Sequence, residues 1–306
     1  MSAVVVNWNG AADLREALSS LVSQTYPNLE VIVVDNGSED ESSQVAEGFG
    51  VRWLPLGRNL GLAPAMNEGA RAATGEYLLF LNNDMRFAPD FVECLEAALA
   101  AHPDAFAADA KQFNWEGTEV VHSQTLLQPS TSVAPPIPNW CLAQLDTAET
   151  APCVFGSAAN LMVRRDQFWE LGGWDAGYLI GSEDLDLCLR AWARGWKTLY
   201  VPEAVCWHRV GAAGDTPTGA RTRLYGSATG TLRLAAIHLP THLWLLVLGR
   251  FVAGTLKDVV GQPHRGVVRL RALWRFAASA PDILRRRRAL NRWGPPTKRL
   301  RAVAEI

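Results

Sequence analysis

Four short apolar runs alternate with stretches of helical periodicity at the start of the chain, and this alternation limits the fold more than any other feature. The runs span residues 4–6, 30–34, 51–56 and 77–81. Between the first two, Leu14, Leu18 and Leu21 recur on one face of a helix. Connections this short imply parallel strands with right-handed crossovers. The sequence therefore predicts an α/β fold, a Rossmann-like, mostly parallel sheet flanked by helices.

The last of these runs, 77–81, ends in Asn82, Asn83 and Asp84. A strand buried on both faces cannot bury such side chains, so we expect them at its C-terminal end. In open α/β sheets ligands bind at that edge. One acid beside two short amides could hold a hard cation and a ribose, although a simple polar turn explains the same residues equally well.

Polar residues also follow the first two runs. Asn7 and Trp8 come after the first run and Asp35 after the second. A carboxylate can accept a hydrogen bond from a nucleotide base, and an indole face can stack on one. Each residue alone could be an ordinary turn residue, but three strand ends on one edge favour a nucleotide site.

A weaker phosphate signal lies between residues 58 and 67. Arg58, Asn59 and Gly61 precede a helix that we expect from about residue 65 to 73 and that carries Asn67. Gly61 permits close backbone approach near a helix N-terminus, where phosphates bind. The chain has neither the dinucleotide glycine fingerprint nor a P-loop motif, so those nucleotide-binding folds are not supported.

The acids Glu183 and Asp184 stand at the start of an expected helix. Leu185, Leu189 and Trp192 share a stripe on it that should face the core. Asp184 then lies at the mouth of the helix, where it could act as a general base. Acids are also favoured in any first helical turn, and this explanation stays open.

His208 follows an expected strand, and its position fits either a packed residue or a metal ligand. The segment 114–152, rich in Thr, Ser and Pro, is expected to be a long loop.

The net charge of −2 is distributed very unevenly. Residues 1–208 carry a net charge of −16 and residues 209–306 carry +14. The basic part holds four helical stretches in which Arg alternates with Leu and Trp. We therefore expect two domains, 1–210 and 211–306, the second one a helical extension that meets an anionic membrane surface, forms a homodimer contact or is merely solvated. Nucleic-acid binding is not expected, because no binding motif accompanies the charge.

Neither a signal peptide nor a membrane span is expected. The first residues have no basic region and run straight into a strand, and Arg250 interrupts the most apolar later segment, 243–256. The five cysteines form no C-x-x-C pair, so reduced thiols in a cytoplasmic protein are the expectation.

Taken together, the motifs resemble those of the family 2 glycosyltransferases with a GT-A fold, and within them the rhamnosyltransferase-like branch. The resemblance covers about residues 3–210. It rests on the segments 4–10, 33–40, 58–69, 81–84, Gly-Gly-Trp-Asp at 172–175, Ser-Glu-Asp-Leu-Asp-Leu-Cys-Leu-Arg at 182–190, and His208.

The resemblance implies an inverting transfer of a sugar from a nucleotide-diphosphate donor, dTDP-rhamnose or a UDP-sugar, to a glycan or lipid-linked acceptor in cell-surface polysaccharide synthesis. Asp184 would be the catalytic base. Trp174 and Glu183 would contact the acceptor, and Asp84 with His208 would bind Mg²⁺ or Mn²⁺. The donor would be bound by Asn7, Trp8, Asp35, Arg58, Asn59, Gly61, Asn67, Asn82 and Asn83.

One departure from the family pattern concerns the metal. The family motif is often Asp-x-Asp, whereas Asn82 stands at its first position here. Asp84 is then the only acid of the motif, and one or two protein ligands can suffice for a hard cation that keeps water and phosphate oxygens. Two alternative functions are a catalytically silent nucleotide-sugar-binding assembly protein and a nucleotidylyltransferase. The acids Asp35, Asp84 and Asp184 argue against the first, and the lack of a Gly-rich basic loop after the first strand argues against the second.

Overall fold

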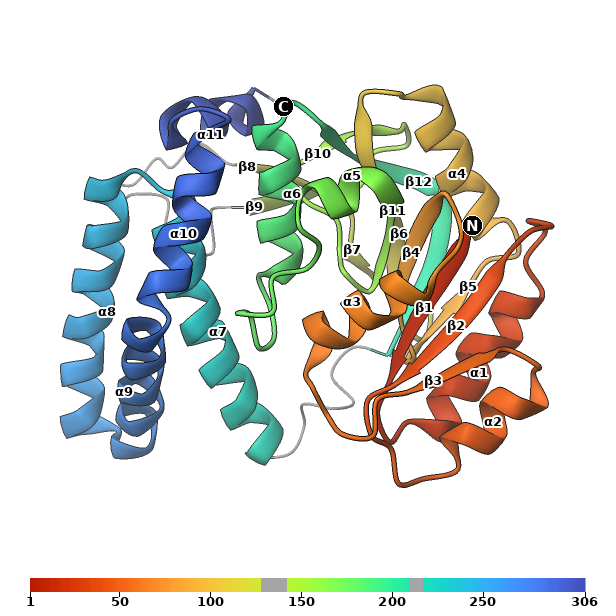
Figure 1. The fold of residues 1–306 in the computed structure, drawn as a ribbon, viewed down its shortest axis with the longest axis horizontal. Coiled ribbons are helices and arrows are strands. Elements are labelled where there is room, and N and C mark those ends of the chain that lie inside the picture. The colour runs from red at the N-terminus through yellow and green to blue at the C-terminus, as the bar shows by residue number, and fades with distance from the viewer. Residues whose placement is uncertain (128–141, 210–216, 306) are drawn as a thin grey trace.

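The computed structural model describes residues 1–127, 142–209 and 217–305, and these form a central sheet with a group of helices beside it (Figure 1). The strand order in the sheet is β10-β12-β6-β11-β4-β1-β2-β3. In Figure 1 the sheet and its covering helices occupy the right and centre, and the C-terminal helices, coloured blue, stand on the left.

The N-terminal half of the sheet has the predicted alternation. Its strands β1, β2, β3 and β4 pair in parallel. Their bounds are Ser2–Asn7, Glu30–Asp35, Arg52–Pro55 and Tyr77–Asn82. The intervening helices are α1 (Ala11–Val22), α2 (Ser42–Gly48) and α3 (Leu62–Ala72). Because the strands are parallel, their polar C-terminal ends lie along one edge, as the sequence predicts.

The other half of the sheet is mixed. Strand β11 runs antiparallel to β4 and β6, β12 runs parallel to β6, and β10, β5 and β7 pair at the margins. Their bounds are β5 Met85–Phe87, β6 Ala105–Asn114, β7 Val120–His122, β10 Ala151–Cys153, β11 Asn160–Arg164 and β12 Lys197–His208.

The prediction of a long loop over residues 114–152 is wrong for the described part of this segment. It contains β7 and also β8 (Gln124–Leu127) and β9 (Leu142–Leu145), which form a separate two-stranded sheet. Residues 128–141 of this segment lie outside the described residues. These strands form because their backbones pair with segments far along the chain. The Thr- and Ser-rich composition of the segment gave no local signal of a strand.

Helices cover both faces of the sheet, and neighbouring strand residues point into the two cores. Val5 of β1 packs in the core under α1 and α4 (Phe91–Ala101), whereas Val4 packs in the core under α3, α5 (Arg165–Glu170) and α6 (Glu183–Ala193). Strands buried on both faces explain why the runs are continuously apolar.

The basic region forms five helices among its described residues, where four were expected. They are α7 (Pro217–His238), α8 (Thr241–Gly261), α9 (Pro263–Ala278), α10 (Ala280–Asn291) and α11 (Pro296–Ala304). Leu232 and Leu234 of α7 share a core with Leu185 and Leu189 of α6. The expected boundary near residue 211 lies outside the described residues, and the division into two domains stays a prediction.

Candidate active site

Amide side chains connect the C-terminal ends of β1 and β4. Asn83 Nδ2 donates a hydrogen bond to Asn7 Oδ1 at 2.7 Å, and Asn7 Nδ2 donates to Ser38 Oγ at 3.2 Å. A Cβ on Gly10 would lie 2.2 Å from Asn83 Nδ2, so a glycine is needed beside this pair. Asn7 and Asn83 therefore orient each other, and part of their hydrogen-bonding capacity is used within the protein.

Asp35 and Trp8 are the two side chains on this edge that suit a nucleotide base. Asp35 is nearly buried, and both of its carboxylate oxygens accept from the backbone N–H of Ser38, at 3.1 and 3.2 Å. A carboxylate has further lone pairs, so it can still accept from a ligand. Trp8 is 57% exposed and leaves its indole uncovered. Ser38 was missed as part of the site, although the Asp-Asn-Gly-Ser order after β2 is a turn signal.

Hydrogen bonds of amide side chains, rather than ion pairs, stabilise the loop before α3. Asn36 Nδ2 donates to Asn59 Oδ1 at 3.1 Å, and the same oxygen accepts from the backbone N–H of Gly61 at 2.9 Å. Gly61 has φ of +90°, a value that few other residues adopt. Arg58 is exposed beside this loop. The loop thus ends at the N-terminus of α3, as predicted, and its contact with a phosphate stays a prediction.

Two predicted substrate contacts, Asn67 and Trp174, lie in the core instead of at a surface. Asn67 Nδ2 donates to the carbonyl of Trp174 at 2.9 Å, and its Oδ1 accepts from the N–H of Trp174 at 3.0 Å. The Trp174 ring is 2% exposed and packs edge-on against Phe80, with 5.1 Å between ring centroids. Asn67 therefore fixes the turn at residues 173–174, and any influence of these two residues on substrates must act through that turn.

Asp84 and His208 face each other across the end of the sheet. Asp84 Oδ1 is buried and has no hydrogen-bond partner among the described residues, and His208 Nε2 lies 3.2 Å from it. No group of three or more His, Cys, Asp and Glu side chains that could hold a metal occurs in the part of the chain described here. The assignment of Asp84 and His208 as ligands of a hard cation, completed by water and substrate oxygens, stays a prediction.

A hydrogen-bond chain behind His208 sets its tautomer. Gln112 Nε2 donates to Asn160 Oδ1 at 2.6 Å, which directs Gln112 Oε1 toward His208 Nδ1, 3.2 Å away. With this acceptor, His208 Nδ1 carries a proton, and His208 Nε2 is the ring nitrogen that faces Asp84 Oδ1. In metal sites, a partner on one ring nitrogen in the same way orients the histidine so that its other nitrogen can face the metal. Gln112 and Asn160 were missed, because no local pattern marks residues that meet only through strand pairing.

Asp184 lies at the start of α6, as predicted, and is partly buried. Its Oδ1 accepts from the backbone N–H of Leu185 at 2.8 Å. Burial raises the pKa of Asp184, while hydrogen bonds from the N–H groups of Leu185 and Ala158 and the charge of His122 lower it. Burial prevails, so the pKa of Asp184 lies above its ordinary value. A carboxyl group perturbed by burial and a nearby charge is a candidate for a functional site.

Glu183 is buried beside Asp184, and its Oε2 has no hydrogen-bond partner among the described atoms. Burial, and then the charge of Asp184, raise the pKa of Glu183 to about 8. At neutral pH Glu183 is therefore mostly protonated, and Asp184 is the member of the pair suited to accept a proton.

A second ionic pair, missed from the sequence, accompanies Asp184. His122 Nε2 lies 2.7 Å from Asp109 Oδ2, and Asp109 Oδ1 accepts from the N–H of Ser157 at 3.0 Å. Burial lowers the pKa of His122, but the charge and hydrogen bond of Asp109 and the charge of Asp184 raise it more. His122 lies on β7, inside the segment that was expected to be a loop.

Residues 157–160 connect the two parts of the site. Ala159 accepts a backbone hydrogen bond from Asn82 at the end of β4, and the N–H of its neighbour Ala158 reaches Asp184. The strand end that carries the Asn-Asn-Asp motif and the expected base are thus on the two sides of one short segment. This parallel sheet, with a polar edge and a base candidate beside it, defines an α/β protein of the GT-A type.

Comparison with known proteins identifies the family. The profile described as "Glycosyl transferase family 2" matches residues 2–172, so the chain belongs to this family and is a glycosyltransferase. An N-acetylglucosaminyl-diphospho-decaprenol L-rhamnosyltransferase of Mycobacterium tuberculosis is 28% identical over 269 residues, covering 79% of this chain and 82% of the relative. The resemblance to the rhamnosyltransferase-like branch is confirmed.

Solved structures confirm the fold. A mannosyltransferase from Pyrobaculum calidifontis, in complex with GDP-Man and Mn²⁺, matches with a TM-score of 0.57 and 19% identity, covering 99% of this chain and 85% of that one. GalNAc-T7 with UDP, GalNAc and Mn²⁺ matches with a TM-score of 0.61 and 18% identity, covering 92% and 56%. At these identities the likeness supports the GT-A fold alone.

Proposed function

We propose that the protein is an inverting glycosyltransferase that moves a sugar, rhamnose from dTDP-rhamnose or another sugar from a UDP-sugar, to a hydroxyl of a lipid-linked glycan in cell-surface polysaccharide synthesis. The observation that carries this proposal is the single edge that bears Asp35, Asp84 and His208, with Asp184 on the neighbouring segment. The similarity to a rhamnosyltransferase that acts on a diphospho-decaprenol acceptor supports the choice of substrates.

Each side chain has a definite task in this proposal. Asp35 accepts a hydrogen bond from the nucleotide base, and Trp8 covers it. Asp184 accepts the proton of the acceptor hydroxyl while the oxygen of that hydroxyl forms a bond to the anomeric carbon of the donor sugar. The bond from that carbon to the diphosphate breaks, and the nucleoside diphosphate leaves with the electron pair. A single displacement inverts the anomeric configuration, and base catalysis of this kind contributes ~10²–10⁴-fold.

Asp84 and His208 would hold Mg²⁺ or Mn²⁺, the second of which accompanies the nucleotide or nucleotide sugar in two structural neighbours. When bound, the cation stabilises negative charge on the diphosphate. The chain's own contribution is to present the lone pairs of Asp84 Oδ1 and His208 Nε2 in one place, with Gln112 keeping the histidine in the required tautomer.

The C-terminal helices supply a surface for a lipid-linked acceptor. On α8, Leu245, Val252, Leu256 and Val260 follow one another at helical spacing and are all exposed, Val260 by 87%. Trp274 on α9 is 75% exposed. Apolar side chains in a strongly basic region suit the surface of an anionic membrane, which would place the enzyme in the cytoplasm at the inner face of the plasma membrane. Within the described residues, no helix combines the length and apolar character needed to cross a bilayer.

Two experiments test the proposal. A panel of dTDP-, UDP- and GDP-sugars, each with Mg²⁺, Mn²⁺ or EDTA, should yield one donor that releases a nucleoside diphosphate in a cation-dependent manner. Binding of a donor without turnover would instead indicate a catalytically silent protein, and pyrophosphate release from a nucleoside triphosphate would indicate a nucleotidylyltransferase.

For the membrane surface, the protein should float with anionic liposomes at low salt. A protein that does not float with them at low salt would contradict the membrane assignment.

A further inference from the structure

Helix α7 touches the backbone of the loop that leads to Asp184. A Cβ on Gly226 would lie 2.1 Å from Ile180 Cγ2 and 2.9 Å from the Ile180 carbonyl oxygen. A Cβ on Gly230 would lie 3.0 Å from the carbonyl oxygen of Gly181. The two glycines are four residues apart on one helix face, so α7 presents bare backbone to residues 180–182.

The loop at this contact has an unusual backbone. Gly181 and Ser182 both adopt the left-handed region, with φ of +78° and +72°. For Ser182 this conformation costs on the order of 1–2 kcal/mol and persists only where the surroundings enforce it. Ser182 is the residue before α6, and its carbonyl accepts the N–H of Asp186 at 3.0 Å. The conformation of residues 181–182 therefore sets the direction in which the first turn of α6, with Asp184, enters the site.

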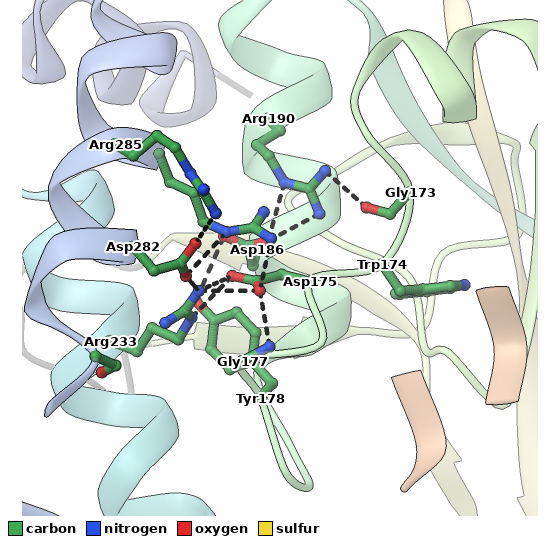
Figure 2. Close-up of polar contacts among 12 residues, drawn as sticks. Gly173, Trp174, Asp175, Gly177, Tyr178, Asp186, Arg190, Arg233, Asp282 and Arg285 are labelled. Atoms are coloured by element: carbon green, nitrogen blue, oxygen red, sulfur yellow. Dashed lines mark hydrogen bonds and ion pairs between the residues drawn. The ribbon is translucent and has the colours of Figure 1, made fainter. Parts of the chain in front are cut away.

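The same face of α7 holds the turn that begins this loop. Arg233 lies three residues after Gly230, and it donates through Nε and Nη2 to the two carboxylate oxygens of Asp175, at 2.8 and 3.0 Å (Figure 2). Both side chains are buried. Arg286 of α10 lies 3.0 Å from Asp175, and Asp282 of α10 pairs with Arg233. A buried pair with these additional partners fixes the turn at residues 172–175.

The far end of the loop is held as well. His238, the last residue of α7, lies 2.8 Å from Asp186 Oδ1 through its Nε2, and Arg190 donates to Asp186 Oδ2 at 2.9 Å. Figure 2 shows the Asp186–Arg190 pair close to the Asp175–Arg233 pair. The segment from Asp175 to Asp186, which ends in the first turn of α6, is thus attached to α7 at its start, its middle and its end.

We propose that α7 is a positioning element for Asp184, and that Gly230, Gly226 and Arg233 are the residues through which it acts. This inference rests on the proposed role of Asp184 as the base. A base must come within hydrogen-bonding reach of the acceptor hydroxyl, and a misplacement of about 1 Å can cost ~10²-fold in rate. The partners of Asp35, Asn7 and Asn83 lie on other elements, so a shift of the 180–182 loop should leave nucleotide binding intact.

The test uses Gly230→Ala, with Gly249→Ala as its matched control. Both changes add one methyl group to a helix, but a Cβ on Gly249 of α8 meets no atom within 4 Å. Gly230→Ala should lower the rate of sugar transfer by roughly two- to tenfold, because the Gly181 carbonyl oxygen, 3.0 Å from the new Cβ, must give by a few tenths of an ångström. It should leave the Kd for the nucleoside diphosphate within about twofold by calorimetry. Gly249→Ala should match the wild type in both.

A second comparison covers the case in which Gly230→Ala fails to fold. Gly226→Ala should lower turnover, and Ile180→Ala, which removes the Cγ2 atom that the new methyl group meets, should restore part of it in the double variant. Wild-type turnover in Gly230→Ala or Gly226→Ala would overturn the proposal, as would an equal loss of nucleotide binding and turnover. Failure of the assignment of Asp184 would appear separately, as unimpaired turnover in Asp184→Asn.

Discussion

The Gln112→Leu substitution is expected to weaken cation binding at Asp84 and His208 without a direct contact to either the cation or Asp84. Gln112 is buried and accepts from His208 Nδ1 at 3.2 Å while it donates to Asn160. Leucine has similar bulk but leaves His208 free to place its proton on Nε2, the atom that faces Asp84. Partners of this kind are typically worth ~10–100-fold in metal affinity.

The expected loss of cation affinity follows from one lost hydrogen bond and the tautomer that it fixes. A buried donor left without its acceptor costs about 1–3 kcal/mol, and 1.4 kcal/mol corresponds to about a factor of ten. The Kd for Mn²⁺ in the presence of nucleoside diphosphate should therefore rise ~5–150-fold, while turnover at saturating Mn²⁺ stays close to that of the wild type. Calorimetric titration with Mn²⁺ measures the first quantity, and donor turnover measures the second.

A double-mutant comparison with His208→Ala makes this prediction specific. Gln112 acts through His208, so Gln112→Leu should add little once His208 is removed. The reasoning would be refuted by an unchanged Mn²⁺ affinity in Gln112→Leu, or by the same loss in the presence and absence of His208.

Three further predictions concern separate parts of the site. Asp35→Ala should raise the Kd for the donor's nucleoside diphosphate ~10–150-fold in calorimetry, since a hydrogen bond to a charged group contributes about 1.5–3 kcal/mol; an unchanged Kd would remove Asp35 from the base site. Asn67→Ala leaves the N–H and C=O of Trp174 unsatisfied and should lower the free energy of unfolding in urea by about 2–6 kcal/mol; a negligible loss would contradict the structural role of Asn67. Folding raises the pKa of Glu183 from 4.5 to about 8, so its stabilising effect is complete below pH 4.5 and is lost as the pH rises toward 8. The Tm of Glu183→Gln minus that of the wild type should accordingly be larger at pH 9 than at pH 5. An equal Tm difference at both pH values would count against the raised pKa.

The N-terminal half of the fold could be predicted because its signals are local. Runs such as Tyr77 to Leu81 are apolar over their whole length because both faces of β4 are covered, and helical periodicity between the runs leaves one simple topology. The polar edge follows directly from the parallel arrangement, so Asp35 and Asp84 could be placed there from the sequence.

The rest of the site depends on contacts between distant segments. Asp175 and Arg233 are 58 residues apart in the sequence, and His208 and Gln112 are 96 apart. No spacing rule links such pairs. The family resemblance implied that Trp174 contacts the acceptor, yet its packing against Phe80 and its two hydrogen bonds with Asn67 bury it.

The most direct test of the central claim is the turnover of Asp184→Asn with the donor that the sugar-nucleotide panel selects. Asparagine keeps the size of the side chain but cannot accept the proton. Transfer should fall by ~10²–10⁴-fold, with the Kd for the nucleoside diphosphate unchanged. Transfer at the wild-type rate would contradict the assignment of Asp184 as the base, and with it the proposed mechanism.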